Sequence, residues 1–384
     1  MLEEAILRMP RTVYSGINTL SHLENILRKG MKKVAVFTDQ GIINAGLLKK
    51  IIEYLDQSQV SYEVLSDLMP EPTYIQAEAV VEAFKTTQAD FIIAVGGGSV
   101  MDIAKLASVL ATDQYNVKDL LEDASIARKF VETLMIPTTA GTGSEATPNS
   151  ILAIPEKELK VGIVSETMIP DYVILDGNMI KNLPRHIAAA TGIDALAHAI
   201  ECFTSTKANA FSDIFALEAL ELIMKNIEKA CHDSEDMEAK NAMLKAAFYA
   251  GVAITGSGTT AVHALSYPLG GKYHIPHGVA NAMLLVPVMR FNAEVMTERF
   301  VKIYDRVVGD DTIKDAKAKT TWILNRMDEI VKHLEIPTDL KTYGIGQDNL
   351  DGLVASAMEV KRLLDNNRKT MTPSDAKEIY QTLL

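Results

Sequence analysis

The chain has 384 residues, and its 38 Lys and Arg against 50 Asp and Glu give a formal net charge of −12. This acidic balance argues against a nucleic-acid-binding protein, because recognition of phosphates needs Lys and Arg clustered on one face. Hydrophobic residues make up 48% and charged residues 23%, which excludes a disordered or collagen-like chain. At ~150 residues per domain, the length predicts roughly two to three domains.

The N-terminus, the apolar stretches and the cysteines bear on cellular location. The segment Met1-Leu-Glu-Glu-Ala lacks the basic stretch and apolar run of a signal peptide. Apolar stretches stay shorter than the ~20 residues that a membrane-spanning helix needs. Two cysteines, Cys202 and Cys231, are too few for a disulfide framework and suit a reducing compartment. We therefore expect a cytoplasmic protein with neither membranes nor nucleic acid among its partners.

In the first half of the chain, short β-type runs alternate with helical patterns, which is typical of βαβ units. The run Phe91–Val95 is apolar at every position, as expected of a parallel strand covered by helices on both faces. These features predict a doubly wound, mainly parallel α/β sheet of the Rossmann type. Strands are expected at 32–39, 61–66, 90–96, 132–136, 150–154, 159–164 and 172–175, helices at 46–58 and 75–87, and a hairpin around Pro155.

The second half of the chain has a helical composition. After Pro184, Ala, Leu, Met, Glu and Lys recur at helical spacing, and runs of β-branched residues are lacking. Thr372 before Pro373, with Asp375 in the first turn, predicts the start of the last helix. The sequence thus predicts an α/β domain over residues 1–180 and an all-helical domain over residues 181–384. Its longer helices are expected at 187–202, 210–230, 237–255 and 315–334.

A glycine loop follows the strand at 90–96 and precedes a helical run. Gly96, Gly97 and Gly98 would let backbone N–H groups approach a pyrophosphate, and Ser99 would cap a helix whose positive end faces that charge. The segment does not have the G-x-G-x-x-G pattern. Taken alone, it is equally compatible with a tight connection between strand and helix.

Two further features favour a dinucleotide site. The loop Pro137-Thr-Thr-Ala-Gly-Thr-Gly-Ser-Glu145 also follows a β-type run and carries hydroxyls suited to phosphate, ribose or amide, although a solvated turn would look alike. Two such loops at carboxyl ends of parallel strands occupy the usual ligand position of an open α/β sheet. Asp39 closes another strand, where it could bind a ribose 2′-OH and favour NAD over NADP, or simply cap the next helix.

Histidines and one aspartate in the second half suggest a metal site. Asp194 and His198 are spaced i and i+4, so they share one helix face. His263, His274 and His277 follow in a second, glycine-flanked segment, so four of the eight histidines fall in these two regions. One carboxylate with several imidazoles suits Zn²⁺ or Fe²⁺ better than Ca²⁺ or Mg²⁺. Each part alone is more often a helix-surface hydrogen bond or a packed histidine.

In their order and spacing, these motifs resemble the iron-containing (group III) alcohol dehydrogenase family. The resemblance rests on Gly96–Ser99, Pro137–Thr142, Thr191–His198 and Pro276–Gly278, and it covers nearly the whole chain. It implies an N-terminal dinucleotide-binding α/β domain, the dehydroquinate synthase-like fold, and an all-helical metal-binding and catalytic domain. It also implies NAD(H) as cofactor, with Fe²⁺ as the expected metal and Zn²⁺ as the other possible one.

Carried over position by position, the resemblance implies a set of site residues. Asp194, His198, His263 and His277 would bind the metal. The residues expected around NAD(H) are Asp39, Gly96, Gly97, Gly98, Ser99, Asp102, Thr138, Thr139, Thr142 and Lys160. Because glycerol dehydrogenase-like and dehydroquinate synthase-like relatives use three protein ligands, Asp194 together with His198 favours the alcohol dehydrogenase branch.

The sequence departs from the family pattern beside the metal ligands. Many members have a second histidine one turn after the position of His263, and this chain has Tyr267 there. Tyr267 could donate a hydrogen bond to substrate or shape the pocket, and His274 could contact substrate or support a ligand. Glu71 also stands where the family often has asparagine.

The predicted reaction is hydride transfer between nicotinamide and a small primary alcohol or aldehyde whose oxygen binds the metal. A polar aldehyde bearing a hydroxyl, sulfonate or phosphonate is one possible substrate. The alternatives are a polyol dehydrogenase of the glycerol type, a lyase of the dehydroquinate synthase type, and a non-catalytic scaffold. The family resemblance also implies a homodimer or larger homo-oligomer.

Overall fold

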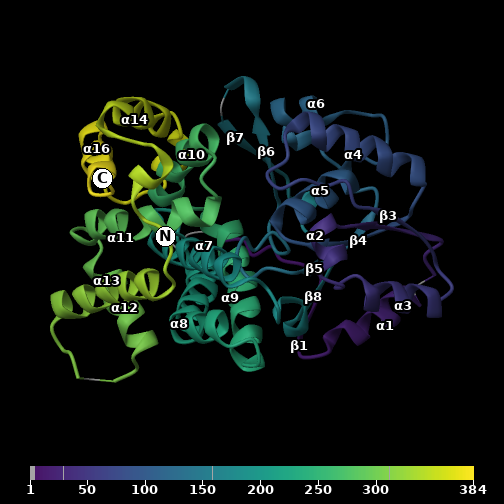
Figure 1. Cartoon of the computed structure of the whole chain (residues 1–384), viewed down its shortest axis with the longest axis horizontal. Coiled ribbons are helices and arrows are strands. Elements are labelled where there is room, and N and C mark those ends of the chain that lie inside the picture. The colour runs from purple at the N-terminus through teal and green to yellow at the C-terminus, as the bar shows by residue number, and fades with distance from the viewer. Residues whose placement is uncertain (1–4, 29, 158, 311) are drawn as a thin grey trace. The chain divides into compact units, whose positions relative to one another are not determined.

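The computed structural model describes residues 5–28, 30–157, 159–310 and 312–384. The chain forms two compact units. An α/β unit comprises Arg8–Thr139 and Gly143–Leu183, and a helical unit comprises Pro184–Leu384 together with Ala140–Thr142 and residues 5–7. The strands of Figure 1 lie within the purple to teal first half of the chain, as the β-type runs predict.

A six-stranded sheet forms the centre of the α/β unit. Its strand order is β1-β8-β5-β4-β2-β3, and every neighbouring pair is parallel. This topology confirms the predicted doubly wound α/β fold. The strands are β1 (Thr12–Gly16), β2 (Lys33–Phe37), β3 (Ser61–Leu65), β4 (Phe91–Gly96), β5 (Glu132–Pro137) and β8 (Tyr172–Asp176).

Helices cover both faces of this sheet and explain its apolar strands. In β4, Ile92 and Ala94 pack into a core with α4 (Tyr74–Thr87) and α5 (Gly98–Val109). Phe91 and Ile93 pack into the opposite core with α1 (His22–Leu27) and α3 (Lys49–Gln57). Because successive side chains of a strand alternate between faces, a strand covered twice is apolar at every position.

Several expectations for the α/β unit differ in detail from the structure. The helix expected at 46–58 begins only at Lys49, and a separate short helix, α2 (Gln40–Asn44), precedes it. Strand β1 was not predicted, because its residues are partly buried or exposed and give no apolar run. The predicted hairpin around Pro155 is confirmed, since β6 (Asn149–Ile154) and β7 (Leu159–Val164) pair antiparallel. Helix α6 (Val117–Glu122) completes the unit.

The helical unit contains the helices predicted at 187–202, 210–230, 237–255 and 315–334, each with slightly shifted bounds. Its last helix starts at the predicted cap, since Thr372 accepts a hydrogen bond from the Asp375 N–H. No helix in the described part of the chain is long and apolar enough to cross a membrane. The helices are α7 (Arg185–Thr204), α8 (Ala210–His232), α9 (Met237–Ser257), α10 (Ala261–Tyr273), α11 (His277–Ala293), α12 (Thr297–Val307), α13 (Ala316–His333), α14 (Leu350–Met358), α15 (Lys361–Leu364) and α16 (Pro373–Gln381).

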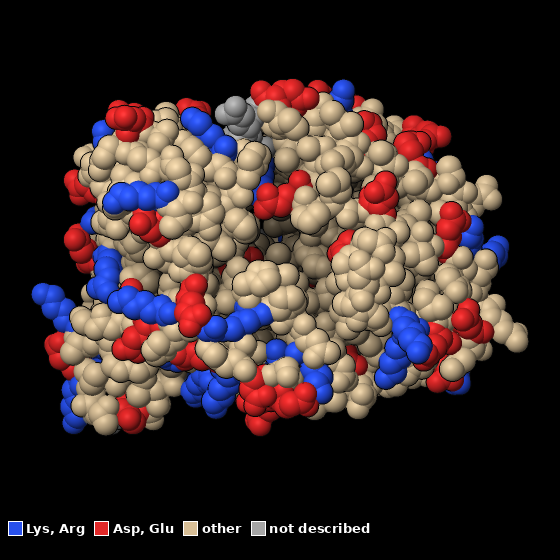
Figure 2. Space-filling view, in the orientation of Figure 1, with Lys and Arg blue, Asp and Glu red and all other residues tan. Residues whose placement is uncertain are grey.

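Charges of both signs are interspersed on the face of the molecule shown in Figure 2. Local ion pairs on the helices include Lys225 with Glu221 at 2.7 Å and Lys332 with Asp328 at 2.7 Å. Exposed pairs of this kind contribute at most ~1 kcal/mol each to stability. The mixed pattern agrees with a composition in which acids outnumber bases by a modest margin.

Candidate metal centre and cofactor loops

Three helices of the helical unit bring the predicted metal ligands together. Helix α7 carries Asp194 and His198, α10 carries His263, and α11 begins at His277. The Oδ1 atom of Asp194 lies 3.8 Å from Nε2 of His198, 3.7 Å from Nε2 of His263 and 3.5 Å from Nε2 of His277. These separations are those of ligand atoms that share one ion at bond lengths of ~2.0–2.2 Å.

The four residues do not contribute equally. Asp194, His263 and His277 each place one ligand atom within 4.8 Å of the others, and His198 is not part of this group. The His198 ring stacks on the His263 ring with centroids 4.6 Å apart. Its Nδ1 atom is buried and has no hydrogen-bond partner among the described residues. The donor set of one carboxylate and imidazoles fits Fe²⁺ or Zn²⁺.

The protonation states of Asp194 and His198 suit a metal site. Burial would raise the pKa of the Asp194 carboxyl, but His198, His277 and His263 together hold that pKa well below its usual range. Burial lowers the pKa of His198 despite the nearby Asp194 charge. Asp194 is therefore an anion and His198 a neutral imidazole near neutral pH, which are the forms that bind cations.

Glu201 forms a hydrogen bond with Nδ1 of His263, the ring nitrogen that does not face Asp194. Sequence reasoning missed this residue. This carboxylate is fully buried, and one of its oxygens accepts the Nδ1–H of His263. Its other oxygen accepts backbone N–H groups of Thr260 at 2.9 Å and Val262 at 2.8 Å. The sequence does contain a signal that could have identified Glu201. Asp194, His198 and Glu201 follow the spacing i, i+4, i+7, so they share one helix face.

The charge of Glu201 also acts on the titration of His263. Burial would lower the pKa of His263, but Glu201 and Asp194 raise it to about 9. The same contacts fix the ring so that Nδ1 faces Glu201 and Nε2 faces Asp194. A histidine oriented by a carboxylate in this way is the usual partner arrangement behind a metal. Binding of a cation at Nε2 requires release of the proton there.

Close packing of α11 on α7 fixes the positions of these ligands. A Cβ atom at Gly278 would lie 2.2 Å from the carbonyl oxygen of Ala190, so only glycine allows this approach. Gly141 makes a similar contact, because a Cβ atom there would lie 2.7 Å from Cβ of Thr191. The glycines of the sequence motifs at Gly141 and Gly278 therefore serve helix packing beside Asp194 and His277.

Tyr267 lies near the ligands, whereas His274 does not join them. The Tyr267 side chain is half-buried, and its ring centroid lies 6.2 Å from that of His277. Burial raises the pKa of the Tyr267 hydroxyl, an effect that the nearby Arg362 charge partly offsets. The hydroxyl is therefore protonated near neutral pH and can donate. His274 is exposed and ends α10 in the left-handed region at φ 54°.

The first predicted cofactor loop of the α/β unit joins β4 to α5. Gly97, not Ser99, is the N-cap of α5, so the prediction that Ser99 caps this helix is wrong. The helix starts earlier because Gly97 has the extended backbone, at φ −80° and ψ −170°, that is usual for an N-cap, and glycine is among the residues accepted there. The Ser99 hydroxyl instead accepts the Glu71 N–H at 3.1 Å. A Cβ atom at Gly96 would lie 2.6 Å from Val100, which shows how tight this turn is.

Several acidic and basic side chains predicted around the cofactor are already engaged within the unit. Asp39 caps α2 by accepting the Ile42 N–H at 3.0 Å, as its alternative interpretation predicts. Lys160 forms an ion pair with Glu71 at 2.8 Å. The hydroxyl-bearing residues Thr138 and Thr139 directly follow β5, and a Cβ atom at Gly97 would lie 3.5 Å from the Thr139 hydroxyl.

Asp102 is an internal support of the second loop. Its buried carboxylate accepts the Ser144 hydroxyl and the Ile151 N–H, the latter at 2.9 Å. It also pairs with the Lys105 ammonium at 3.0 Å. Asp102 thereby connects α5 to the segment that follows the Thr138–Thr142 hydroxyls.

Lys105 and Glu145 are two buried ionisable residues that sequence reasoning missed. Lys105 is fully buried and donates to the carbonyl oxygens of Ser144 at 3.0 Å and Thr147 at 3.4 Å. Burial raises the pKa of the Glu145 carboxyl to about 7, although its backbone hydrogen bond and the Lys105 charge oppose this. Both residues appear in the sequence as an ordinary helix lysine and a loop acid, so their burial could not be read from it.

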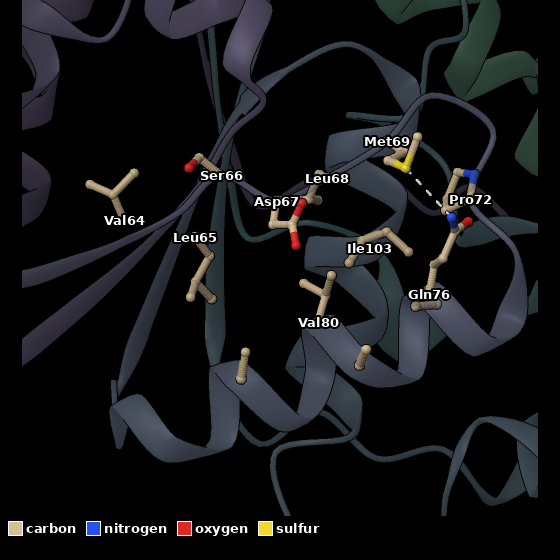
Figure 3. A pocket seen from close by; sticks show the side chains of 13 residues that line it. Val64, Leu65, Ser66, Asp67, Leu68, Met69, Pro72, Gln76, Val80 and Ile103 are labelled. Atoms are coloured by element: carbon tan, nitrogen blue, oxygen red, sulfur yellow. Dashed lines mark hydrogen bonds between the residues drawn. The ribbon is translucent and has the colours of Figure 1, made fainter.

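A pocket of about 440 Å³ opens in the α/β unit at the carboxyl end of the edge strand β3 (Figure 3). Its walls are mainly apolar, and Gln76 of α4 approaches the Met69 sulfur at 3.5 Å. None of the predicted cofactor or metal residues lines it. The lining residues are Val64, Leu65, Ser66, Asp67, Leu68, Met69, Pro72, Gln76, Ala77, Ala79, Val80, Ala83 and Ile103.

Comparison with known proteins gives the family of this chain. Residues 10–177 match the model of iron-containing alcohol dehydrogenases, and residues 188–384 match the C-terminal model of the same family. The chain belongs to the iron-containing alcohol dehydrogenase family. It is therefore an oxidoreductase that interconverts alcohols and aldehydes with NAD(H) and a bound metal ion.

Relatives within the family match along almost the whole chain. Long-chain-alcohol dehydrogenase 1 of Geobacillus thermodenitrificans is 34% identical over 376 residues, which cover 97% of this chain and 95% of that one. The solved structure of a 1,3-propanediol oxidoreductase has a TM-score of 0.93 at 27% identity and covers 100% of both chains. Sulfoacetaldehyde reductase from Bifidobacterium kashiwanohense, solved in complex with NAD⁺, has a TM-score of 0.87 at 27% identity, covering 100% and 99%.

Proposed function

We propose that this iron-containing alcohol dehydrogenase holds one Fe²⁺ ion through Asp194, His198, His263 and His277, with Zn²⁺ as the competing metal for the same ligands. The observation that carries the proposal is the convergence of Asp194, His263 and His277, whose ligand atoms lie within 4.8 Å of one another. The bound ion would supply a Lewis acid for the oxygen of an alcohol or aldehyde. Zn²⁺ generally binds such ligands more tightly than Fe²⁺, so metal supply during expression decides which ion is present.

The α/β unit is proposed to bind NAD(H) at the carboxyl ends of β2, β4 and β5. The N–H groups at the start of α5, after Gly96, Gly97 and Gly98, suit the pyrophosphate. Asp39 is proposed to bind the adenosine ribose while it caps α2, and the hydroxyls of Ser99, Thr138, Thr139 and Thr142 to bind phosphate or the nicotinamide ribose and amide. Lys160 adds a cation to this set. Asp102 is proposed to act mainly through the Ser144 and Ile151 contacts that hold the loop.

The protein groups around the metal are proposed to have distinct tasks. Asp194 supplies the negative charge that balances the cation, and Glu201 orients the His263 ring. Tyr267 keeps its proton because burial raises the pKa of its hydroxyl, so its Oη can donate a hydrogen bond to the substrate. His274 is proposed to contact substrate from the exposed end of α10, rather than to bind the metal.

The substrate is proposed to be a small primary alcohol or aldehyde with a polar group. Arg362 of α15 supports this choice, because α15 packs on α10 and the Arg362 charge acts on the Tyr267 hydroxyl. Neither the Tyr267 hydroxyl nor Arg362 has a hydrogen bond or ion pair with another described side chain. A hydroxyl donor near the predicted ligands, with a cation that acts on it, suits a substrate group such as a hydroxyl, sulfonate or phosphonate. A cytoplasmic homodimer or larger homo-oligomer stays a prediction.

The test is oxidation of NADH at 340 nm by anaerobic, Fe²⁺-reconstituted protein against a panel of small aldehydes. Chelator-treated protein and an Asp194→Ala variant serve as controls. We expect turnover that both controls abolish. Metal- and NADH-bound protein that reduces no aldehyde would contradict the proposal and favour a lyase of the dehydroquinate synthase type, whose reaction shows no net change in NADH.

A further inference from the structure

We propose that Asn281 is a positioning residue that sets the metal affinity of this centre by holding three ligand atoms toward one point. The inference rests on the proposed function, because it takes Asp194, His263 and His277 as metal ligands. It adds a residue outside the predicted ligand set. Sequence reasoning missed it, although Asn281 follows His277 by one helical turn.

The geometry of the Asn281 amide carries the proposal. Its Nδ2 atom donates to Oδ1 of Asp194 at 2.7 Å. The same nitrogen lies 3.2 Å from Nε2 of His263 and 3.2 Å from Nε2 of His277. One side chain from α11 thus contacts the proposed ligands of α7, α10 and α11 at once.

The carbonyl oxygen of the Asn281 side chain also supports the proposed positioning role. Asn281 is fully buried, and its Oδ1 atom has no hydrogen-bond partner among the described residues. A buried carbonyl without a partner is costly, so the contacts of the nitrogen must determine where this side chain lies. A neutral amide also suits the place, because a Lys or Arg there would repel the bound cation.

The consequence for metal binding follows from preorganisation. The hydrogen bond to Asp194 fixes the carboxylate direction, and it can persist when the ion binds because a carboxylate oxygen has a second lone pair. The contacts to the two Nε2 atoms place the same amide against both imidazoles before the ion binds. Without the amide, the ion would have to order these side chains when it binds. Groups that orient metal ligands typically account for 10–100-fold in metal affinity.

The experiment compares Asn281→Leu with Asn292→Leu, a matched control on the same helix. Asn292 is also fully buried, but its amide donates to Asn367 at 2.8 Å. Metal-free wild type and variants are titrated with Zn²⁺ against a chromophoric chelator, and Co²⁺ absorption reports the ligand geometry. We expect Asn281→Leu to weaken Zn²⁺ binding by about 10–100-fold and to change the Co²⁺ spectrum, and Asn292→Leu to do neither.

The outcomes separate this inference from the proposed function. Zn²⁺ affinity of Asn281→Leu within about threefold of wild type would overturn the role of Asn281 and leave the proposed metal site intact. Wild type that binds no divalent ion stoichiometrically would overturn both. If Asn281→Leu does not fold, Asn281→Ser replaces it in the same titration. It removes the amide with less steric change, and the same threefold limit decides.

Discussion

The proposed metal centre and the proposed cofactor loops use their side chains in opposite ways. At the metal centre, Asp194 and the histidines direct their ligand atoms at a common point, and Glu201 and Asn281 hold them there. In the cofactor loops, Asp102 and Lys105 are buried and hold the loop itself. The proposed metal centre therefore acts through its side chains. The proposed cofactor loops instead present backbone N–H groups and hydroxyls, and their buried charged side chains hold the loop in place.

The largest expected effect breaks the metal centre. Asp194→Ala removes the carboxylate that balances the cation, so we expect the protein to retain NADH binding and lose stoichiometric metal. Because a metal contributes several kcal/mol to stabilisation of the reacting oxygen, kcat/KM should fall by about 1,000-fold or more. Metal analysis and fluorescence titration with NADH measure the two parts. Retained metal at full occupancy would contradict the ligand assignment.

The next prediction concerns Glu145, a buried residue of the second predicted cofactor loop, and the pH dependence of the free energy of unfolding. In the folded protein burial raises the pKa of Glu145 from 4.5 to about 7, so the folded state prefers the protonated carboxyl. The free energy of unfolding should therefore decrease as pH rises from about 4.5 to about 7, by up to ~3 kcal/mol, and then stay constant.

Glu145→Gln removes this titration. The variant should match wild type near pH 4 and exceed it in the free energy of unfolding at pH 8, as urea denaturation at the two pH values can measure. Glu156→Gln, at an exposed acid of the same unit, is the control. A wild-type minus variant difference that does not change with pH would show that Glu145 ionises normally.

A smaller effect is expected from Glu201, which orients the His263 ring. Glu201→Gln keeps the shape of the side chain but removes the charge that faces His263, and we expect metal affinity to fall by about 10–100-fold. Chelator competition measures it, with Glu221→Gln on the partly exposed side of α8 as control. Equal affinities of Glu201→Gln and wild type would mean that the His263 ring needs no charged partner.

The smallest expected effect concerns substrate choice. Arg362→Ala should lower kcat/KM for an anionic aldehyde such as sulfoacetaldehyde by about tenfold, because a hydrogen bond to a charged group contributes ~1.5–3 kcal/mol. Propanal should be affected little. Lys361→Ala, at the exposed neighbouring base of α15, is the control. Equal losses for both aldehydes would assign Arg362 to structure instead of specificity.

The comparison also shows where prediction from the sequence worked and where it did not. Apolar runs predicted the central strands because their two faces are both covered, whereas β1 at the sheet edge lacks that signal. Ser99 was predicted as a cap because serine is a common cap, but Gly97 takes this role at the end of β4. At the metal centre, i and i+4 spacing placed Asp194 and His198 on one helix face.

By itself, the sequence determined the fold class, the central strands, the longer helices and the residue types capable of metal chemistry, because these depend on local periodicity and composition. Only the tertiary structure decided which groups meet. The contacts of Glu201 with His263, of Asn281 with Asp194, and of Lys105 with Ser144 join segments far apart in the chain. Their roles depend on burial and on contacts between helices and loops. Local spacing places Glu201 on the helix face of Asp194 and His198, but it does not show which partner Glu201 meets.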